Sequence, residues 1–414
     1  MTSPEDPGGP RRTSRARIPR ITAELRERET VKPLELFFDL VFVLGFTQCT
    51  RLMETESGWA GIGQGILVLA VLWWAWTGYA WLTSVIEPEE GAVRIVIFAA
   101  MAALLIVALS VPGAFGDRAL TFALAYGFVR VGHIALFVIA SRDDPGLRSS
   151  VVSLAISTAI GVGLLVGASF LDTGAQAAVW GVAILLDWGG PFLFGVSGWR
   201  LVPGHFAERH NLVIILALGE SIVALGVGAE IDLTAGVITA AVLGVGLASA
   251  LWWIYFDVVS LVTARRLTLS TEGRQRNALA RDSYSYLHFP MVAGIVLAAL
   301  GLEETLAHVD EAFDAEHAFA LLGGVAIYLL AHVALRLRNA RTVNVERLGL
   351  ALVLFAVIPV AVWVPALASL VGVNVLLWAM IAYETIRVYD EGRYRLRHGL
   401  DMEVPGPLGR EQAT

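Results

Sequence analysis

Two carboxylates enter an otherwise apolar segment near the start of the chain. The segment 33–48 reads PLELFFDLVFVLGFTQ and places Glu35 and Asp39 four residues apart, on one face of a predicted helix. A carboxylate held in apolar surroundings is suited to taking up a proton or a cation. Glu35 falls in the first helical turn, where the helix dipole favours an acid. Asp39 lies one turn deeper, so we predict that Asp39 is the titrating member of the two.

Other apolar segments also carry charged or polar side chains. A rise of about 1.5 Å per residue places some of them near the middle of a bilayer and the others nearer its cytoplasmic side. Each charged group costs roughly 2.5–3.5 kcal/mol unless it faces the protein interior and finds a partner. We therefore expect these groups to converge into one polar core. With Asp39, its predicted members are Arg130, His133, Asp187, Glu220, Asp257, Asp282, Tyr286 and His288.

Arg130 determines how the buried charges must pair. A guanidinium keeps its proton, so a buried Arg130 requires a carboxylate, and Asp187 and Glu220 lie at its predicted depth. One of these two acids then remains without this partner, which suits proton or cation handling. A charged centre that lines a pathway and a structural ion pair that fixes helix packing both fit this pattern.

The sequence shows no motif of a known catalytic or metal site. We find no P-loop, no nucleophile elbow, no zinc-protease H-E-x-x-H and no cysteine pair, since Cys49 is the single cysteine. Ser221, with Glu220 and His288, is the one set that would suit an intramembrane enzyme acting on lipid. We expect no enzyme activity, no cofactor and no metal. Nucleic-acid binding is not expected either, because a folded basic domain is lacking.

The composition places these residues in a membrane protein. Hydrophobic residues make up 56% and charged residues 16% of the 414 residues, with a mean hydropathy of +0.67. Soluble domains carry roughly a quarter charged residues. We predict an all-α membrane bundle of about twelve transmembrane helices, since apolar runs of about 20 residues recur and a barrel would show shorter, alternating segments. The predicted spans are 34–53, 59–86, 92–112, 118–141, 147–171, 174–199, 208–229, 232–262, 276–303, 316–338, 345–365 and 367–388.

Arginines alternate between the predicted loops. Cytoplasmic segments, on the side of the N-terminus, hold arginines such as Arg94, Arg142 and Arg265, whereas the opposite loops are neutral or acidic, with Arg51 and Arg118 near them. Cytoplasmic loops of membrane proteins carry an excess of Lys and Arg. The distribution predicts a multi-pass protein with both termini in the cytoplasm.

The chain is predicted to consist of two halves between two tails. HIALF from His133 recurs as HVALRL from His332 six spans later, and the first and seventh spans both begin with a glutamate, Glu35 and Glu208. An even number of spans per repeat predicts parallel halves. The parts are a disordered basic cytoplasmic tail at 1–32, a first six-helix half at 33–200, a second at 201–390 and a cytoplasmic C-terminal tail at 391–414.

Four segments of the chain together resemble one family. They read ELFFDLVFVLGFTQ, AERHNLVIILALGESIVALG, LWWIYFD and YSYLHFPMVAGIV, in this order. From Val31 to about Arg387 the sequence resembles the bacterial low-temperature-requirement protein A family. The resemblance implies a polytopic protein of the bacterial inner membrane, without an established substrate. The family positions that it implies here are Glu35, Phe38, Asp39, Glu208, Arg209, His210, Gly219, Glu220, Ser221, Trp253, Asp257, His288 and Pro290.

These features favour a secondary transporter or permeation protein. Asp39 and Glu220 would titrate, Arg130 would be their counter-charge, and Tyr286 and His288 would line a polar core for a proton or monovalent cation. The lipid bilayer is the expected surroundings, while a small-molecule substrate and an oligomeric state stay open. The alternative is a non-transporting membrane protein of envelope or low-temperature stress adaptation, whose buried ion network is structural.

Overall fold

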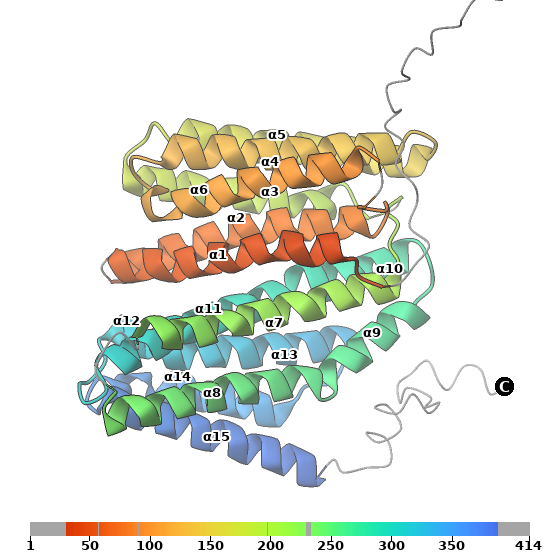
Figure 1. Ribbon diagram of the computed structural model, residues 1–414. Helices are drawn as coiled ribbons and strands as arrows, with labels where there is room; N and C mark the ends of the chain where they lie inside the picture. The colour runs from red at the N-terminus through yellow and green to blue at the C-terminus, as the bar shows by residue number, and fades with distance from the viewer. Residues whose placement is uncertain (1–29, 57, 90, 197, 229–232, 388–414) are drawn as a thin grey trace, which may run out of the picture.

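The protein folds as a bundle of helices that lie side by side (Figure 1). The computed structural model describes residues 30–387, except for residues 57, 90, 197 and 229–232. The predicted all-α fold is confirmed. In chain order the elements are α1 (Pro33–Thr55), α2 (Trp59–Thr83), α3 (Val93–Ser110), η1 (Val111–Gly113), α4 (Ala119–Ala140), α5 (Pro145–Ala168), α6 (Thr173–Leu193), α7 (Pro203–Gly228), α8 (Ala235–Phe256), α9 (Val259–Leu269), α10 (Arg274–Leu279), η2 (Ala280–Tyr286), α11 (His288–Ala307), α12 (Ala315–Ala318), η3 (Phe319–Gly323), α13 (Gly324–Ala340), α14 (Val345–Ala361) and α15 (Ala366–Arg387).

Helices occupy the positions of all the predicted spans, but three spans are built from several pieces. The eighth span is α8 followed by α9, the ninth combines α10, η2 and α11, and the tenth combines α12, η3 and α13. Within the described residues, nine helical segments are long and apolar enough to cross a membrane, and α6, α7 and α14 are not among them. The count of twelve therefore stays a prediction.

The bundle exposes apolar side chains and buries charged ones. Ile95, Val131 and Leu185 are 67%, 68% and 74% exposed along α3, α4 and α6, while Arg130 and Arg209 are almost fully buried. A protein in water rarely presents so many exposed apolar side chains. The distribution is the one that a hydrocarbon environment requires, because lipid favours apolar surface and charges must find partners inside.

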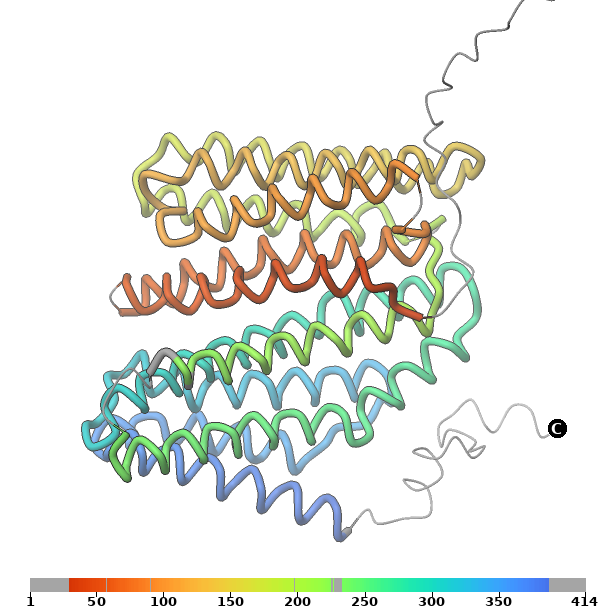
Figure 2. Tube along the Cα trace, viewed as in Figure 1, coloured from red at the N-terminus to blue at the C-terminus, as the bar shows by residue number. Residues whose placement is uncertain are grey.

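The helices divide into two groups, α1–α6 and α7–α15, which lie on opposite sides of the α1–α7 contact (Figure 2). In the first group α1 packs against α2 and α3, and in the second α7 packs against α8 and α11. The pairs α3–α4, α4–α5, α5–α6 and α2–α6 likewise have the counterparts α11–α13, α13–α14, α14–α15 and α8–α15. Two six-helix repeats would produce these neighbours, and the repeat itself stays a prediction.

Two glycines bring α11 and α13 close together. A Cβ atom built on Gly294 would lie 2.6 Å from the carbonyl oxygen of Gly324, and one built on Gly324 would lie 2.7 Å from that of Gly294. Small residues allow helix backbones to approach closely where lipid gives no hydrophobic drive for association. This contact holds α11, which is buried along most of its length, in the centre of the second half.

A π-helical turn, η2, precedes Pro290 and joins the two halves. Proline removes one backbone hydrogen bond and predicts an irregularity in this helix. The carbonyl group of Ser285 in η2 accepts a hydrogen bond of 2.7 Å from the indole N–H of Trp73 in α2. The hydroxyl group of Tyr286 donates to the carbonyl group of Trp188 in α6. Tyr286, predicted to line the polar core, is therefore bonded between the halves.

Candidate ion-handling site at the α1–α7 interface

Helices α1 and α7 run parallel and in register along the contact between the two halves. Both begin with a proline, Pro33 and Pro203, at positions 170 residues apart. The bonded pairs Glu35–His205 and Asp39–Arg209 have the same separation of 170 residues. A constant difference in residue number arises only when two helices point the same way. We call this contact the α1–α7 interface, and the end of the bundle where α1 begins and α15 ends the terminal face (Figure 1).

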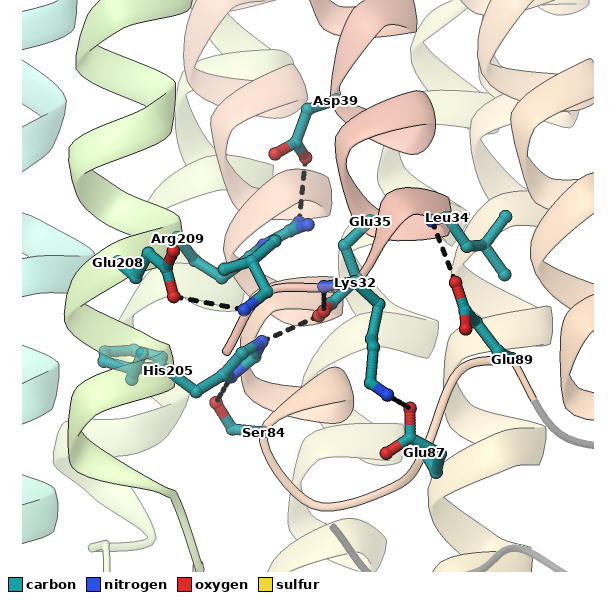
Figure 3. A network of polar contacts seen from close by, with 12 residues as sticks. Lys32, Leu34, Glu35, Asp39, Ser84, Glu87, Glu89, His205, Glu208 and Arg209 are labelled. Carbon is teal, nitrogen blue, oxygen red and sulfur yellow. Dashed lines mark hydrogen bonds and ion pairs between the residues drawn. The ribbon is translucent and has the colours of Figure 1, made fainter. Parts of the chain in front are cut away.

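The first layer of the interface joins Glu35 to His205. The two side chains are almost fully buried, and the imidazole Nε2 lies 2.8 Å from Glu35 Oε1. When Glu35 is ionised its carboxylate only accepts hydrogen bonds, and the proton of this bond then lies on Nε2. Nδ1 of His205 lies 2.9 Å from the hydroxyl group of Ser84, so both ring nitrogens are bonded (Figure 3). Glu35 also accepts a 2.9 Å hydrogen bond from the backbone N–H of Lys32, as an acid in a first helical turn can.

The second layer joins Asp39 to Arg209, one helical turn deeper. Nη2 of Arg209 donates to Asp39 Oδ1 over 2.8 Å, and the two side chains are each 1% exposed (Figure 3). The indole N–H of Trp76 donates to the same oxygen over 2.9 Å. The guanidinium also lies over the Trp76 ring, 5.6 Å from its centroid. The carboxylate is thus held by two donors while its Oδ2 has no hydrogen-bond partner among the described residues.

Glu208 does not take the position that the predicted repeat assigns to it. The sequence pairs Glu208 with Glu35 as the first acid of a helix, whereas the structure aligns Pro203 with Pro33. Glu208 is exposed and accepts a 3.1 Å hydrogen bond from the backbone N–H of Val31 (Figure 3). It therefore fixes the start of α1 at the terminal face and is not a member of the buried core.

Glu220 forms the third layer, toward the opposite face. Its carboxylate accepts hydrogen bonds from the hydroxyl groups of Thr47, over 2.7 Å, and Thr50, over 2.9 Å, and the residue is 1% exposed. No basic side chain of the described residues lies within 4.0 Å of it. Because α7 begins at Pro203, before the predicted residue 208, Glu220 lies about 25 Å along the helix, past the predicted mid-membrane depth.

Apolar side chains separate the second layer from the third. Asp39 and Thr50 are eleven residues apart on α1, which corresponds to about 16 Å along the helix axis. Phe42 and Phe46 follow on the face of Asp39, and each is 1% exposed. Two buried aromatic side chains therefore lie between the two buried carboxylates along α1.

Arg130 and Asp187 pair away from this interface, inside the first half. Nη2 of Arg130 lies 3.1 Å from Asp187 Oδ2, and it also donates to the hydroxyl group of Thr158 over 2.6 Å. The space beside the pair measures about 10 Å³, which suits one water molecule at most. His133 lies next to the pair, where only a glycine leaves room: a Cβ atom on Gly78 would lie 2.9 Å from its ring.

The predicted single polar core is therefore wrong in its grouping. Arg130 meets Asp187, as their depths predict, and Glu220 is the acid left over. However, Glu220 lies on α7 at the interface between the halves, while the arginine lies on α4. The position of a residue along its span predicts its height in the membrane but not its place around the bundle. Side chains predicted at the same height were therefore assigned to one core although they lie on different helices, in different parts of the bundle.

His288 belongs to a bonded group inside the second half. Nδ1 lies 2.8 Å from the carbonyl oxygen of Ser283 and Nε2 lies 2.8 Å from the hydroxyl group of Tyr255, which also bonds Asn211 over 2.9 Å. The Tyr255 hydroxyl group donates to the amide oxygen of Asn211, and both ring nitrogens of His288 have a partner. This arrangement stabilises the packing of α7, α8 and α11, and it does not bring His288 to Glu220.

The remaining predicted residues lie at several separate places. Asp282 binds Arg281 and Arg338 near the terminal face, over 2.7 and 2.9 Å. Asp257 and Trp253 line a cavity in the second half. Other predicted positions are packed within the bundle: Phe38 lies against Tyr79 and His210 lies against Trp76. Ser221 is buried, and Gly219 has open space beside it.

Four residues of the interface were not predicted as site residues from the sequence. They are His205, Trp76 and the two threonines that hold Glu220, Thr47 and Thr50. A signal for the histidine exists: Glu35 and Asp39 follow Pro33 by two and six residues, and His205 and Arg209 follow Pro203 by the same distances with the complementary chemistry. The threonines carry no charge and give no such signal.

The fold and these buried pairs define a multi-pass integral membrane protein of helical-bundle type. Within the ranges that the structure describes, no group of three or more His, Cys, Asp or Glu side chains is placed to hold a metal ion. The chain belongs to the bacterial low temperature requirement A protein (LtrA) family, whose family model matches residues 30–382. An uncharacterized protein of Rhizobium meliloti (strain 1021) is 26% identical over 373 residues, which cover 85% of this chain and 90% of the relative. No solved structure matches the chain.

Proposed function

We propose that this protein is a transport or permeation protein of the bacterial inner membrane, which moves a proton or small monovalent cation along the α1–α7 interface. The observation that carries the proposal is Glu220, a buried carboxylate at the contact of the two halves with two hydroxyl groups as its partners. A charged group at membrane depth costs roughly 2.5–3.5 kcal/mol. A bound proton or cation removes that cost, which makes Glu220 a binding group.

Each layer of the interface has a role in this proposal. Glu220 receives the ion from the face opposite the terminal face, with the oxygens of Thr47 and Thr50 beside it. Asp39 is the second binding group, and Arg209 neutralises it while it is empty. Phe42 and Phe46 separate the two sites, so the ion passes only when the halves move apart between these layers.

The arginine distribution supports the orientation that we propose. Arg94, Arg142, Arg265 and Arg338 lie in or next to the ends of helices near the terminal face, on the predicted cytoplasmic side. Positively charged loops remain in the cytoplasm. We therefore propose that the terminal face is cytoplasmic and that Glu220 is nearer the periplasmic side.

Ion flux into liposomes tests the proposal. Full-length protein is reconstituted, and proton and potassium fluxes are followed with a pH-sensitive dye and a potassium-sensitive dye under an imposed gradient. We expect flux above that of empty liposomes, a loss of at least tenfold in Glu220→Gln and a clear loss in Asp39→Asn. Asp117→Asn, which changes an exposed acid outside the interface, serves as the matched control and should keep the flux.

One result would contradict the proposal. If wild-type liposomes match empty ones, or if Glu220→Gln and Asp39→Asn leave every flux unchanged, the interface does not carry ions. The alternative function, a non-transporting membrane protein of envelope or low-temperature stress adaptation, would then be favoured. Its support is the Arg130–Asp187 pair, which is closed and nearly dry, as a structural ion pair should be.

A further inference from the structure

Each threonine at Glu220 has two acceptors within hydrogen-bond distance. Thr47 Oγ1 lies 2.7 Å from Glu220 Oε2 and 3.2 Å from the carbonyl oxygen of Val43. Thr50 Oγ1 lies 2.9 Å from Glu220 Oε1 and 3.0 Å from the carbonyl oxygen of Phe46. A hydroxyl group carries one proton and two lone pairs, so each threonine donates to one of its two acceptors at a time. Rotation about the Cβ–Oγ1 bond exchanges the carboxylate for a carbonyl group of the same helix.

These two choices match the two protonation states of Glu220. An ionised carboxylate only accepts hydrogen bonds, and it then receives one from each threonine, on separate oxygens. A protonated Glu220 donates its proton to one threonine oxygen, and the hydroxyl proton of that threonine turns to the helix carbonyl group. The other threonine keeps its hydrogen bond to the second carboxyl oxygen. Every hydroxyl and carboxyl proton thus has an acceptor in both states, although no carbon, nitrogen or oxygen atom moves.

The same oxygens are poorly placed for an alkali cation. A dehydrated potassium ion takes several oxygen ligands, as the carbonyl oxygens of potassium channels show. Here the carboxylate and hydroxyl oxygens lie in direct contact, at 2.7 and 2.9 Å, and leave no room for an ion between them. Two titratable side chains interact electrostatically with Glu220, Glu303 of α11 and Cys49 of α1, and neither is basic. A bound proton neutralises Glu220 without displacing its threonine partners.

The first layer of the interface also has two states that differ by one proton. With a neutral imidazole, Nε2 of His205 donates to Glu35 over 2.8 Å and Nδ1 accepts from the hydroxyl group of Ser84 over 2.9 Å. With an imidazolium ion, Nδ1 donates to the same hydroxyl oxygen, since a hydroxyl group can also accept. A histidine that is bonded at both nitrogens is suited to proton relay. Figure 3 shows the charged side chains around it, among them Lys32, Glu35, Asp39, Glu87, Glu208 and Arg209.

A space lined by both the first and the second layer admits one water molecule. It measures about 10 Å³, and Glu35 and Arg209 both line it. A cavity of about this size holds a single water molecule. One water molecule can pass on a proton, whereas an alkali ion with its hydration shell needs far more room.

Resting on the proposed function of the α1–α7 interface, we propose that the ion it carries is a proton and not an alkali cation. Glu220 takes up the proton on one carboxylate oxygen, and the threonine hydroxyl group at that oxygen turns to its helix carbonyl group. When Glu220 releases the proton, both threonines donate to the carboxylate again. The proton next binds Oδ2 of Asp39, which has no hydrogen-bond partner among the described residues, and then the Glu35–His205 pair, which loses it to water at the terminal face. Each step moves one proton and restores the group that held it.

Membrane potentials in liposomes test which ion is carried. Full-length protein is reconstituted, and a voltage-sensitive dye follows the response to each gradient separately. In N-methylglucamine buffer, which contains neither sodium nor potassium ions, a pH gradient should generate a potential that empty liposomes do not show. A potassium or sodium gradient at equal pH should generate none.

Substitutions at the threonines test the rotation of their hydroxyl groups. Thr47→Val with Thr50→Val keeps the shape of both side chains but removes the hydroxyl groups, and we expect at least a tenfold loss of proton flux. Thr47→Ser with Thr50→Ser keeps the hydroxyl groups and should retain at least a third of the wild-type flux. Thr55→Val is the matched control and should leave the flux unchanged, because Thr55 is exposed and its hydroxyl group donates to the carbonyl group of Arg51.

The outcomes separate this inference from the function on which it rests. A potential from a potassium or sodium gradient at equal pH, or a proton flux that requires either ion, would overturn the inference and leave an interface that carries ions. The absence of any potential would overturn both. A folded valine double variant with wild-type proton flux would overturn the role of the threonines, and the gradients on the unchanged protein stay decisive if that variant does not fold.

Discussion

Removing the charge of Arg130 should strongly destabilise the folded protein. Arg130→Met keeps an unbranched apolar side chain of similar length but leaves Asp187 buried without the cation that lies 3.1 Å away, and Thr158 loses its 2.6 Å partner. Breaking a buried ion pair from one side costs about 3–5 kcal/mol. The ratio of folded to unfolded protein should therefore fall by about two to three and a half orders of magnitude.

The unfolding free energy in mixed micelles, measured by titration with sodium dodecyl sulfate, provides the assay. Arg200→Met is the matched control, because Arg200 pairs with Asp144 over 2.8 Å while its side chain is 64% exposed. Exposed pairs contribute about 1 kcal/mol or less. The double variant Arg130→Met with Asp187→Leu removes both charges and should recover most of the loss. A cost below about 1 kcal/mol for Arg130→Met, or a double variant as unstable as the single one, would refute the reasoning.

Three further substitutions probe the helix contacts by the same unfolding measurement. Gly294→Ala should lower the unfolding free energy by about 1–3 kcal/mol, because the new methyl group would lie 2.6 Å from the carbonyl oxygen of Gly324 in α13. An unchanged unfolding free energy would show that the two helices can separate there. Trp76→Phe removes an N–H donor to a buried carboxylate and should cost about 1.5–3 kcal/mol, more than Trp59→Phe at an exposed site. Thr50→Val removes one of the two hydroxyl groups that donate to Glu220 and should likewise cost about 1.5–3 kcal/mol; unchanged stability would contradict a role of this hydrogen bond in the fold.

Much of the fold follows from the sequence, because the length of an apolar run is a direct physical requirement of the bilayer. The pairing of Arg130 with Asp187 could be predicted in the same way, since a buried guanidinium must have a carboxylate. The register of α1 against α7 was not predicted. The sequence offers two ways to align the halves, by Glu35 with Glu208 or by Pro33 with Pro203, and only packing decides between them.

The remaining parts of the site depend on contacts that leave no local pattern. Thr47 and Thr50 are ordinary residues of an apolar helix until Glu220 from α7 lies between them. The cavity around Asp257 and His332 is a property of how five helices diverge, and a sequence shows which residues are polar but not where space remains.

The common register of α1 and α7 restricts how the two halves can move. A slip of one residue along the interface would translate one helix by about 1.5 Å, and restoring the facing residues would require a rotation of about 100°. The pairs at Glu35, Asp39 and Glu220 would then all break in the same step. Sliding therefore has a large free-energy cost. Tilting one half about the terminal face would instead separate the Glu220 layer first and keep the other pairs bonded. The layers Glu35–His205 and Asp39–Arg209 lie at the end of the interface about which such a tilt would turn.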